Sequence, residues 1–349
     1  MSIAVSICLP TRNSIRFLPE RLASIRSQTL TDWELVAVDS HSEDGTREML
    51  GQFAAADPRV RVCQAPRDGI YPNFNRCIRL ARGRFVYIAT SDDTMAHDCL
   101  EKLVAALIGN PDCDLAHCPM RVIDEDGLPG RDWWSGSSMF ARSSGDLLHC
   151  PHKRIAPFDG MLCLLGDNIY SSVTQLLINR ALFDRIGFYQ ADWGPLGDFH
   201  WNLRAGLAAS TVHVPDTWGG WRMHASQATA GVRLGSPEHQ GQIDAMIGDV
   251  LRHLDRCLDD AARGAAFEEL VKRTRALRGH LREHARRQST LNRRLFLIRE
   301  ALLGRPLAWR HLASLAAGRG RWPQAAPQAL RAWFGNSGLV PLAGEFRHH

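Results

Sequence analysis

The segment FVYIATSDD, residues 85–93, is the stretch around which the rest of the chain is organised. A short apolar run of this kind is typical of a buried strand in a parallel sheet. It ends in Asp92 and Asp93, and ligands of open α/β sheets collect at the carboxyl ends of strands. Adjacent acids repel each other unless a cation lies between them, which favours a divalent metal that also contacts a phosphate. An isolated Asp-Asp pair is more often a solvated turn, so other segments must support the metal interpretation.

The first 110 residues alternate between strand-like and helix-like segments. Apolar runs predict strands at residues 3–9, 33–39, 60–64 and 85–89, and helical spacing or turn signals predict helices at about 17–25, 46–56, 73–81 and 98–108. This alternation predicts an α/β fold with a doubly wound, mostly parallel sheet flanked by helices. Because Thr11, Asp39 and Asp68 end or follow strands in this scheme, they should reach the edge that carries Asp92 and Asp93. Such an edge suits a nucleotide and a metal ion.

Neither of the common glycine-rich phosphate motifs follows the first predicted strand. The absence of Gly-x-Gly-x-x-Gly disfavours a dinucleotide site, and Gly-x-x-x-x-Gly-Lys is also missing. If phosphates bind to this chain, a metal ion must therefore neutralise much of their charge.

Four segments, in this order, resemble family 2 glycosyltransferases with the GT-A fold. They are SICLPTRN at 6–13, WELVAVDS with SEDGT within 33–46, DGIY through ARGR at 68–84, and TSDD at 90–93. Each motif is loose, and the specificity of the resemblance lies in their order over the first 110 residues. It implies a GT-A, Rossmann-like domain with a nucleotide-sugar half at residues 1–110. The acceptor-binding, catalytic half would then be residues 111–235.

The resemblance also implies roles for individual residues of the first half. The nucleotide-sugar site would include Pro10, Thr11, Asn13, Asp39, Asp68 and Asp92. Asp93 and Asp92 would hold the metal on the diphosphate. Many family members carry a further acid before this pair, where Ala89, Thr90 and Ser91 stand here. The direct metal ligand is therefore open between Asp92 and Asp93, and Asp93 is favoured. Taken singly, these residues also suit turns and loop caps.

The second half offers a candidate general base and a closing segment. Asp198 is expected in the first turn of an amphipathic helix, after a loop of glycine and proline. An acid there can simply complement the helix dipole, whereas the resemblance implies that Asp198 is the base, with Gly197 where Glu is frequent. In WGGWRMH, residues 218–224, the resemblance implies that Arg222 clamps the diphosphate and that His224 binds the metal or a phosphate.

Together these features predict a metal-dependent, inverting glycosyltransferase that uses Mg²⁺ or Mn²⁺ and a nucleotide sugar, with a UDP-sugar favoured. The acceptor would be a hydroxyl of a saccharide or lipid-linked saccharide in surface polysaccharide synthesis, and the inverting outcome comes from the resemblance. Two alternatives are a nucleotidyltransferase on a similar sheet and a non-catalytic binding or scaffold protein that acts through its basic tail.

The C-terminal region differs from the body in charge. The chain has 349 residues and a net charge of +5, yet residues from 261 onward hold 17 Lys/Arg and 5 Asp/Glu, a net +12, which leaves −7 on the rest. Apolar residues at helical spacing predict an α-helical, Arg-rich extension over residues 236–349. Such an extension could pack on the preceding α/β domain as a helical cap, or contact an anionic membrane surface peripherally. It contains no nucleic-acid recognition motif.

The compartment is expected to be the cytoplasm, with the inner face of the membrane as the site of any peripheral contact. Nine cysteines without a paired framework suit a reducing environment. No continuous apolar stretch approaches the ~18 residues of a membrane-spanning helix, and the first residues enter a strand-like run without a signal-peptide pattern.

Overall fold

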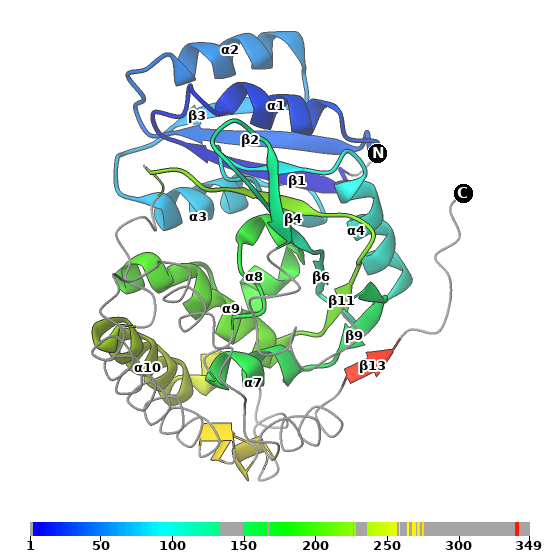
Figure 1. Cartoon of the computed structure of the whole chain (residues 1–349), viewed down its shortest axis with the longest axis vertical. Coiled ribbons are helices and arrows are strands. Elements are labelled where there is room, and N and C mark those ends of the chain that lie inside the picture. The colour runs from blue at the N-terminus through cyan, green and yellow to red at the C-terminus, as the bar shows by residue number, and fades with distance from the viewer. Residues whose placement is uncertain are drawn as a thin grey trace, which may run out of the picture.

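The computed structural model describes residues 3–132, 149–165, 168–225, 227 and 236–256, with 258, 264, 267–269, 271–272, 274–275 and 339–341. The strands of the central sheet are β1 (Val5–Thr11), β2 (Trp33–Asp39), β3 (Val60–Gln64), β4 (Phe85–Ile88), β6 (Leu115–His117), β9 (His152–Arg154), β10 (Leu176–Asn179), β11 (Thr211–His213) and β13 (Leu339–Pro341). Their spatial order is β13-β9-β11-β6-β10-β4-β1-β2-β3 (Figure 1).

The N-terminal part of this sheet is parallel, as the sequence predicts. β1 lies between β2 and β4 and runs parallel to both, and β3 runs parallel to β2. The register pairs Thr11 with Asp39, so the ends of β1 and β2 lie at the same edge. β10 then joins β4 and β6 as an antiparallel strand, so the sheet is mixed toward its C-terminal side.

Helices cover both faces of the sheet, which confirms the predicted architecture of a central sheet flanked by helices (Figure 1). The helices are α1 (Leu18–Arg26), α2 (Thr46–Ala56), α3 (Ile70–Leu80), α4 (Cys99–Gly109), α7 (Phe158–Leu165), α8 (Ala181–Ile186), α9 (Gly197–Ala208) and α10 (Pro237–Arg252). One core joins the sheet to α1, α2 and α4. A second core joins the opposite face to α3, α7, α8 and α9. Successive side chains of β1 alternate between these cores, since Ile7 belongs to one and Cys8 to the other.

A second, smaller sheet lies beside the loop that follows β4. It consists of β5 (Thr94–Met95), β7 (Met120–Ile123), β8 (Pro129–Asp132) and β12 (Gly219–Arg222), in the order β5-β12-β7-β8. β12 pairs with β5 through Gly219–Met95 and Gly220–Thr94. A Cβ atom at Gly220 would lie 2.4 Å from Thr94 Oγ1, so only glycine permits this approach. The pairing brings residues 221–224 beside Asp92 and Asp93.

Two predicted boundaries differ from the structure. The helix expected at about residue 73 begins at Ile70, directly after Gly69, whose φ of 107° turns the chain into the helix. Pro72 lies in its first turn, where the missing N–H has no helical partner to lose. The sequence of residues 171–178 also predicts a strand, yet β10 begins only at Leu176. A 3₁₀ turn at Val173–Gln175 precedes it, because Ser172 caps that turn.

The basic C-terminal extension can be followed only in part. α10 confirms a helix at its start, and Ile243, Met246 and Ile247 pack on α7 and α9. Most of the helices predicted beyond residue 256 lie outside the described residues, apart from short pieces. Within the described parts of the chain, no helix is long and apolar enough to cross a membrane.

Candidate active site

Two cavities meet at the carboxyl ends of β1 and β4. The first has a volume of about 520 Å³ and is lined by Pro10, Thr11, Arg12, Asn13, Ser14, Arg16, Phe17, Ser40, Arg67, Gly69, Ile70, Asn73, Thr90, Ser91, Asp92, His224 and Gln227. The second, of about 450 Å³, is lined by Asp68, Gly69, Ile70, Tyr71, Pro72, Phe74, Thr90, Asp92, Asp93, Ser171, Ser172, Val173, Ala191, Gly194, Pro195, Asp198, Trp221 and Gln227. Asp92 and Thr90 border both. We call them the first cavity and the second cavity.

Thr11 and Asp39 form a buried pair at one end of the first cavity. Thr11 Oγ1 donates to Asp39 Oδ1 at 3.0 Å, and the Ser42 hydroxyl and N–H donate to the two oxygens of Asp39 at 2.5 and 3.0 Å. Thr11 lines the cavity, whereas Asp39 is fully buried behind it. The structure therefore brings the predicted residues together, with Asp39 holding the loop and Thr11 exposed to the cavity.

Asn13 shapes the turn that follows β1. Its φ of 48° lies in the left-handed region, which Asn tolerates better than most residues. The Asn13 N–H donates to Ser42 Oγ at 2.9 Å, and Asn13 Oδ1 accepts from the N–H of Glu43 at 3.0 Å. These bonds join the loops after β1 and β2, so Pro10 and Asn13 line the cavity on a fixed turn.

Asp68 lines the second cavity and is paired with an arginine of α3. Arg76 Nη1 and Nη2 donate to Asp68 Oδ1 and Oδ2 at 2.7 and 2.5 Å, a bidentate ion pair. Arg76 lowers the pKa of Asp68 from its ordinary value by these hydrogen bonds. Arg76 Nη1 also donates to Asn73 Oδ1 at 2.8 Å, so this pair stabilises the first turns of α3. Asp68 borders the second cavity and not the first.

The two acids after β4 have different surroundings. Asp93 is 2% exposed; its Oδ1 accepts the N–H of Arg222 at 2.8 Å, and its Oδ2 accepts from the Thr90 hydroxyl. Burial, and next the charge of Asp92, raise the pKa of Asp93 to about 7. The side chain of Asp92 is 30% exposed and borders both cavities. The geometry thus makes Asp92 the more accessible carboxylate, although the sequence favours Asp93.

The guanidinium of Arg222 is committed to protein partners. Arg222 Nε donates to the carbonyl of Asp92 at 2.7 Å, Nη1 donates to the carbonyls of Asp124 and Glu125 at 2.8 and 3.1 Å, and Nη2 is paired with Glu20. Arg222 is 1% exposed and borders neither cavity. It therefore holds the Asp92 loop against the β7–β8 hairpin. The predicted diphosphate clamp would have to be a different cation.

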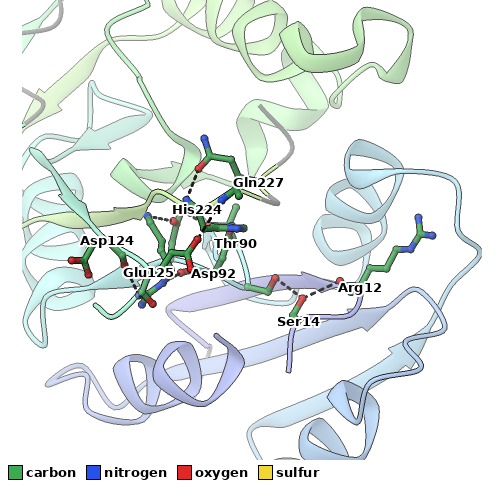
Figure 2. Close-up of polar contacts among 12 residues, drawn as sticks. Arg12, Ser14, Thr90, Asp92, Asp124, Glu125, His224 and Gln227 are labelled. Carbon is green, nitrogen blue, oxygen red and sulfur yellow. Dashed lines mark hydrogen bonds and ion pairs between the residues drawn. The ribbon is translucent and has the colours of Figure 1, made fainter. Parts of the chain in front are cut away.

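His224 lies directly beside Asp92. Its Nε2 is 2.9 Å from Asp92 Oδ2 (Figure 2). The centroid of its ring lies 4.7 Å from that of Phe17. The described residues contain no group of three or more His, Cys, Asp or Glu that could form a complete protein cage for a metal. Mg²⁺ is commonly held by one or two carboxylates together with substrate phosphates and water. Asp92 offers one such carboxylate at the cavity and His224 an adjacent nitrogen, so the pair fits a metal that takes its other ligands from phosphate and water.

Asp198 lies in the first turn of α9 and borders the second cavity. Its Oδ1 accepts the N–H of Phe199 at 2.7 Å. Burial raises the pKa of Asp198 to about 6, and the neighbouring backbone N–H groups oppose that shift only partly. A carboxyl group with such a pKa is ionised at neutral pH and basic enough to accept a proton. The geometry thus places the predicted base across the second cavity from the β4 loop.

Arg12 and Arg16 are cavity residues that the sequence interpretation did not identify. Arg12 and Arg16 line the first cavity, and Figure 2 shows that Arg12 extends away from Asp92 and His224. Arg16 forms an exposed ion pair with Glu125, Nη2 to Oε2 at 2.7 Å, beside the segment that carries His224. The hydroxyl of Ser91 shares a 2.8 Å hydrogen bond with that of Ser14. Arg12 could have been predicted as a cavity residue, because it follows Thr11 in the turn after the first strand.

The fold and the cleft define an α/β protein with a polar, acidic site at the carboxyl ends of its parallel strands. A sequence model of one family, Glycosyl transferase family 2, matches residues 6–186. This match spans more than half of the 349 residues, and the chain therefore belongs to glycosyl transferase family 2.

Relatives in sequence are similar over part of their length. TuaG of Bacillus subtilis, named as a teichuronic acid biosynthesis glycosyltransferase, is 29% identical over 126 residues, which are 36% of this chain and 50% of TuaG. The PGL/p-HBAD biosynthesis glycosyltransferase of Mycobacterium bovis is 29% identical over 216 residues, 60% of this chain and 73% of that protein. The chain thus spans only about half of the length of TuaG.

Solved structures share the fold. S. aureus TarS 1–349 in complex with UDP-GlcNAc has a TM-score of 0.54 and 18% identity, covering 74% of this chain and 68% of that chain. The mannosyltransferase PcManGT from Pyrobaculum calidifontis, in complex with GDP-Man and Mn²⁺, has a TM-score of 0.51 and 19% identity, covering 94% and 84%. At these identities the likeness establishes the fold alone.

Proposed function

We propose that this chain is a metal-dependent, inverting glycosyltransferase that moves a sugar from a nucleoside-diphosphate sugar to a hydroxyl of a saccharide or lipid-linked saccharide. The observation that carries the proposal is the meeting of the two cavities at Asp92, with the half-buried acid Asp198 bordering only the second. A donor in the first cavity and an acceptor in the second would meet beside Asp92. Family membership favours this over a nucleotidyltransferase or a scaffold protein.

The first cavity suits the nucleotide. Thr11 and Asn13 face it from the turn after β1, and Arg12 extends toward the end away from His224. Its position there supports contact with the nucleoside. Arg16, beside the segment that carries His224, is the cation that we assign to the diphosphate. These residues lie in the first 110 of the chain, which supports the assignment of that half to the donor.

Asp92 and His224 are the residues that would hold Mg²⁺ or Mn²⁺. When bound, the metal supplies positive charge that stabilises the departing nucleoside diphosphate. The accessibility of Asp92 and its contact with His224 support this pair. Asp93, whose oxygens accept hydrogen bonds from Arg222 and Thr90, would keep the loop in place. A UDP-sugar is the donor that we test first, because the structural neighbour TarS was solved with UDP-GlcNAc.

Asp198 would act as the general base. It would take the proton of the acceptor hydroxyl while that oxygen attacks the anomeric carbon and the bond to the nucleoside diphosphate breaks. A single displacement of this kind inverts the anomeric configuration. The burial that raises the pKa of Asp198 to about 6 strengthens it as a base at neutral pH.

A panel of UDP-, GDP- and TDP-sugars tests the proposal. Purified protein should show a metal-dependent thermal shift with one nucleotide class and should release the nucleoside diphosphate from the matching sugar when an acceptor is present. The product's anomeric configuration, read by NMR coupling constants, should be opposite to that of the donor. Absence of binding and of turnover with every donor, in Mg²⁺ and in Mn²⁺, would reject the proposed function.

A further inference from the structure

A tyrosine lies directly against the start of the helix that carries Asp198. A Cβ atom built on Gly197 would lie 2.5 Å from Tyr71 Cε2 and 2.7 Å from Tyr71 Cζ. Such distances are far inside van der Waals contact, so the ring of Tyr71 occupies the volume that any side chain at position 197 would need. Gly197 and Tyr71 are therefore a matched pair. Tyr71 also borders the second cavity, together with Asp198.

The ring of Tyr71 is held in place from two sides. It stacks on Tyr189 with a centroid distance of 6.0 Å and an interplanar angle of 15°, and it meets the edge of Phe74 at 5.8 Å. Asn75 fixes Tyr189 in turn, because Asn75 Nδ2 donates to the Tyr189 carbonyl at 2.8 Å and Asn75 Oδ1 accepts the Tyr189 N–H at 3.0 Å. Tyr71 itself is 9% exposed. These contacts oppose movement of the Tyr71 ring away from a larger residue at 197.

Tyr71 and Asp198 line the same cavity, and the charge of Asp198 influences the pKa values of both Tyr71 and Tyr189. Burial raises the pKa of Tyr71 above its ordinary value, and the charge of Asp198 raises it further. The pKa of Tyr189 is raised by the same two causes in the same order. Tyr71 therefore stays neutral at any pH at which the protein would work.

We propose that Tyr71 is a positioning residue for Asp198: its ring fills the space beside Gly197, fixes the first turn of α9 and keeps water from one side of the carboxyl group. This inference rests on the proposed function, in which Asp198 takes the acceptor's proton. In this proposal the ring of Tyr71, and not its hydroxyl group, keeps water away from Asp198. Tyr71→Phe and Tyr71→Ala should therefore behave differently.

Turnover as a function of pH separates these two variants. Activity requires ionised Asp198, so it should fall as the pH drops below about 6 in the wild type. In Tyr71→Phe, activity should fall at the same pH as in the wild type, and kcat should stay within about threefold of the wild-type value. Tyr71→Ala admits water to Asp198, so its acid limb should move down by about one pH unit and kcat should fall about tenfold. The donor KM should stay constant in both variants, because Tyr71 does not border the first cavity.

A double-mutant cycle with Gly197→Ala tests the contact itself. In the wild-type background the new Cβ collides with Tyr71, so kcat should fall strongly. In the Tyr71→Ala background that collision is gone, and adding Gly197→Ala should cost at least about tenfold less in kcat. Phe53→Ala is the matched control for loss of a buried ring. Phe53 is 8% exposed and packs with α1 on the opposite face of the sheet. Its kcat and acid limb should match the wild type.

The inference would be overturned if Tyr71→Ala kept the pH profile and kcat of the wild type. It would also be overturned if the effects of Tyr71→Ala and Gly197→Ala on kcat were additive, or if Phe53→Ala lost as much activity as Tyr71→Ala. Circular dichroism establishes that each variant is folded, and Tyr71→Leu replaces Tyr71→Ala if the latter unfolds. Asp198→Asn distinguishes this failure from that of the proposed function. If Asp198→Asn keeps wild-type turnover, the role of Asp198 fails; if it is inactive while Tyr71→Ala is normal, only the role of Tyr71 fails.

Discussion

His224 Nε2 lies 2.9 Å from Asp92 Oδ2, although 132 positions separate the two residues in the chain. The pairing of β12 with β5 creates this contact, because it sets residues 219 and 220 opposite residues 95 and 94. The contact joins the loop after β4 to the segment that follows β12. It also gives a direct test of where the metal binds.

His224→Ala should abolish most of the metal-dependent stabilisation by nucleotide. A ligand at 100 times its Kd stabilises a protein by about 2.7 kcal/mol, which corresponds to several degrees in Tm. We expect UDP with Mn²⁺ to produce such a shift in the wild type and less than about half of it in His224→Ala. His97→Ala, which removes an exposed histidine, is the control. An unchanged Mn²⁺-dependent shift in His224→Ala would exclude His224 as a ligand.

Asp92→Asn and Asp93→Asn should separate the two acids after β4. In Asp93→Asn the amide oxygen can still accept the Arg222 N–H and the amide nitrogen can donate to Thr90, so the loop should survive. We expect this variant to retain measurable metal affinity. Asp92→Asn removes the carboxylate that faces both cavities and should weaken Mn²⁺ binding at least about tenfold. Titration calorimetry with Mn²⁺ and UDP measures both, and the reverse order would establish Asp93 as the direct ligand.

Asp198→Asn should abolish transfer and raise stability at neutral pH. Because the pKa of Asp198 is about 6 in the folded protein and 3.8 ordinarily, the folded state disfavours the charged form. The penalty is absent below pH ~4, grows as the pH rises through about 6, and is then constant. The substitution should therefore raise the free energy of unfolding by about 1–3 kcal/mol above pH 6 and leave it nearly unchanged at pH 4. Urea unfolding at both pH values measures this; equal effects at pH 4 and pH 7.5 would refute the shifted pKa.

Arg222→Ala and Arg16→Ala should affect different properties. Arg222 is buried with four protein partners, so its loss should lower the free energy of unfolding by about 2–4 kcal/mol and release the Asp92 loop. Arg16 is exposed, with a side-chain exposure of 61%, and its loss should leave stability unchanged within about 0.5 kcal/mol. Arg16→Ala should instead raise the donor KM. A donor KM unchanged in Arg16→Ala would remove it from the diphosphate site.

The sequence sufficed for the order and type of the N-terminal elements, because the strands are continuous apolar runs ending in polar turns. It also brought Thr11, Asp39 and Asp92 to one edge, since parallel strands end together. It did not reveal that Arg222 is buried while Arg16 is exposed. That difference depends on the pairing of β12 with β5 and β7, which no local pattern encodes.

Tyr71 and Gly197 illustrate the same limit. Position 197 is a glycine, and the sequence alone offers no reason for a glycine there. The structure supplies one, because a ring from a helix start more than a hundred residues earlier fills the space. The start of α3 was predicted three residues too late, because Gly69 turns the chain into the helix at Ile70.

The most direct test of the account compares wild type, Asp198→Asn and Asp192→Asn for nucleoside diphosphate release from the donor identified by thermal shift, with Mn²⁺ and a saccharide acceptor present. Asp192 is an exposed acid in the turn before α9 and serves as the matched control. Wild type and Asp192→Asn should release nucleoside diphosphate at the same rate. Asp198→Asn should be at least about a thousandfold slower, although it remains folded and binds the donor. Turnover by folded Asp198→Asn at the wild-type rate would contradict it.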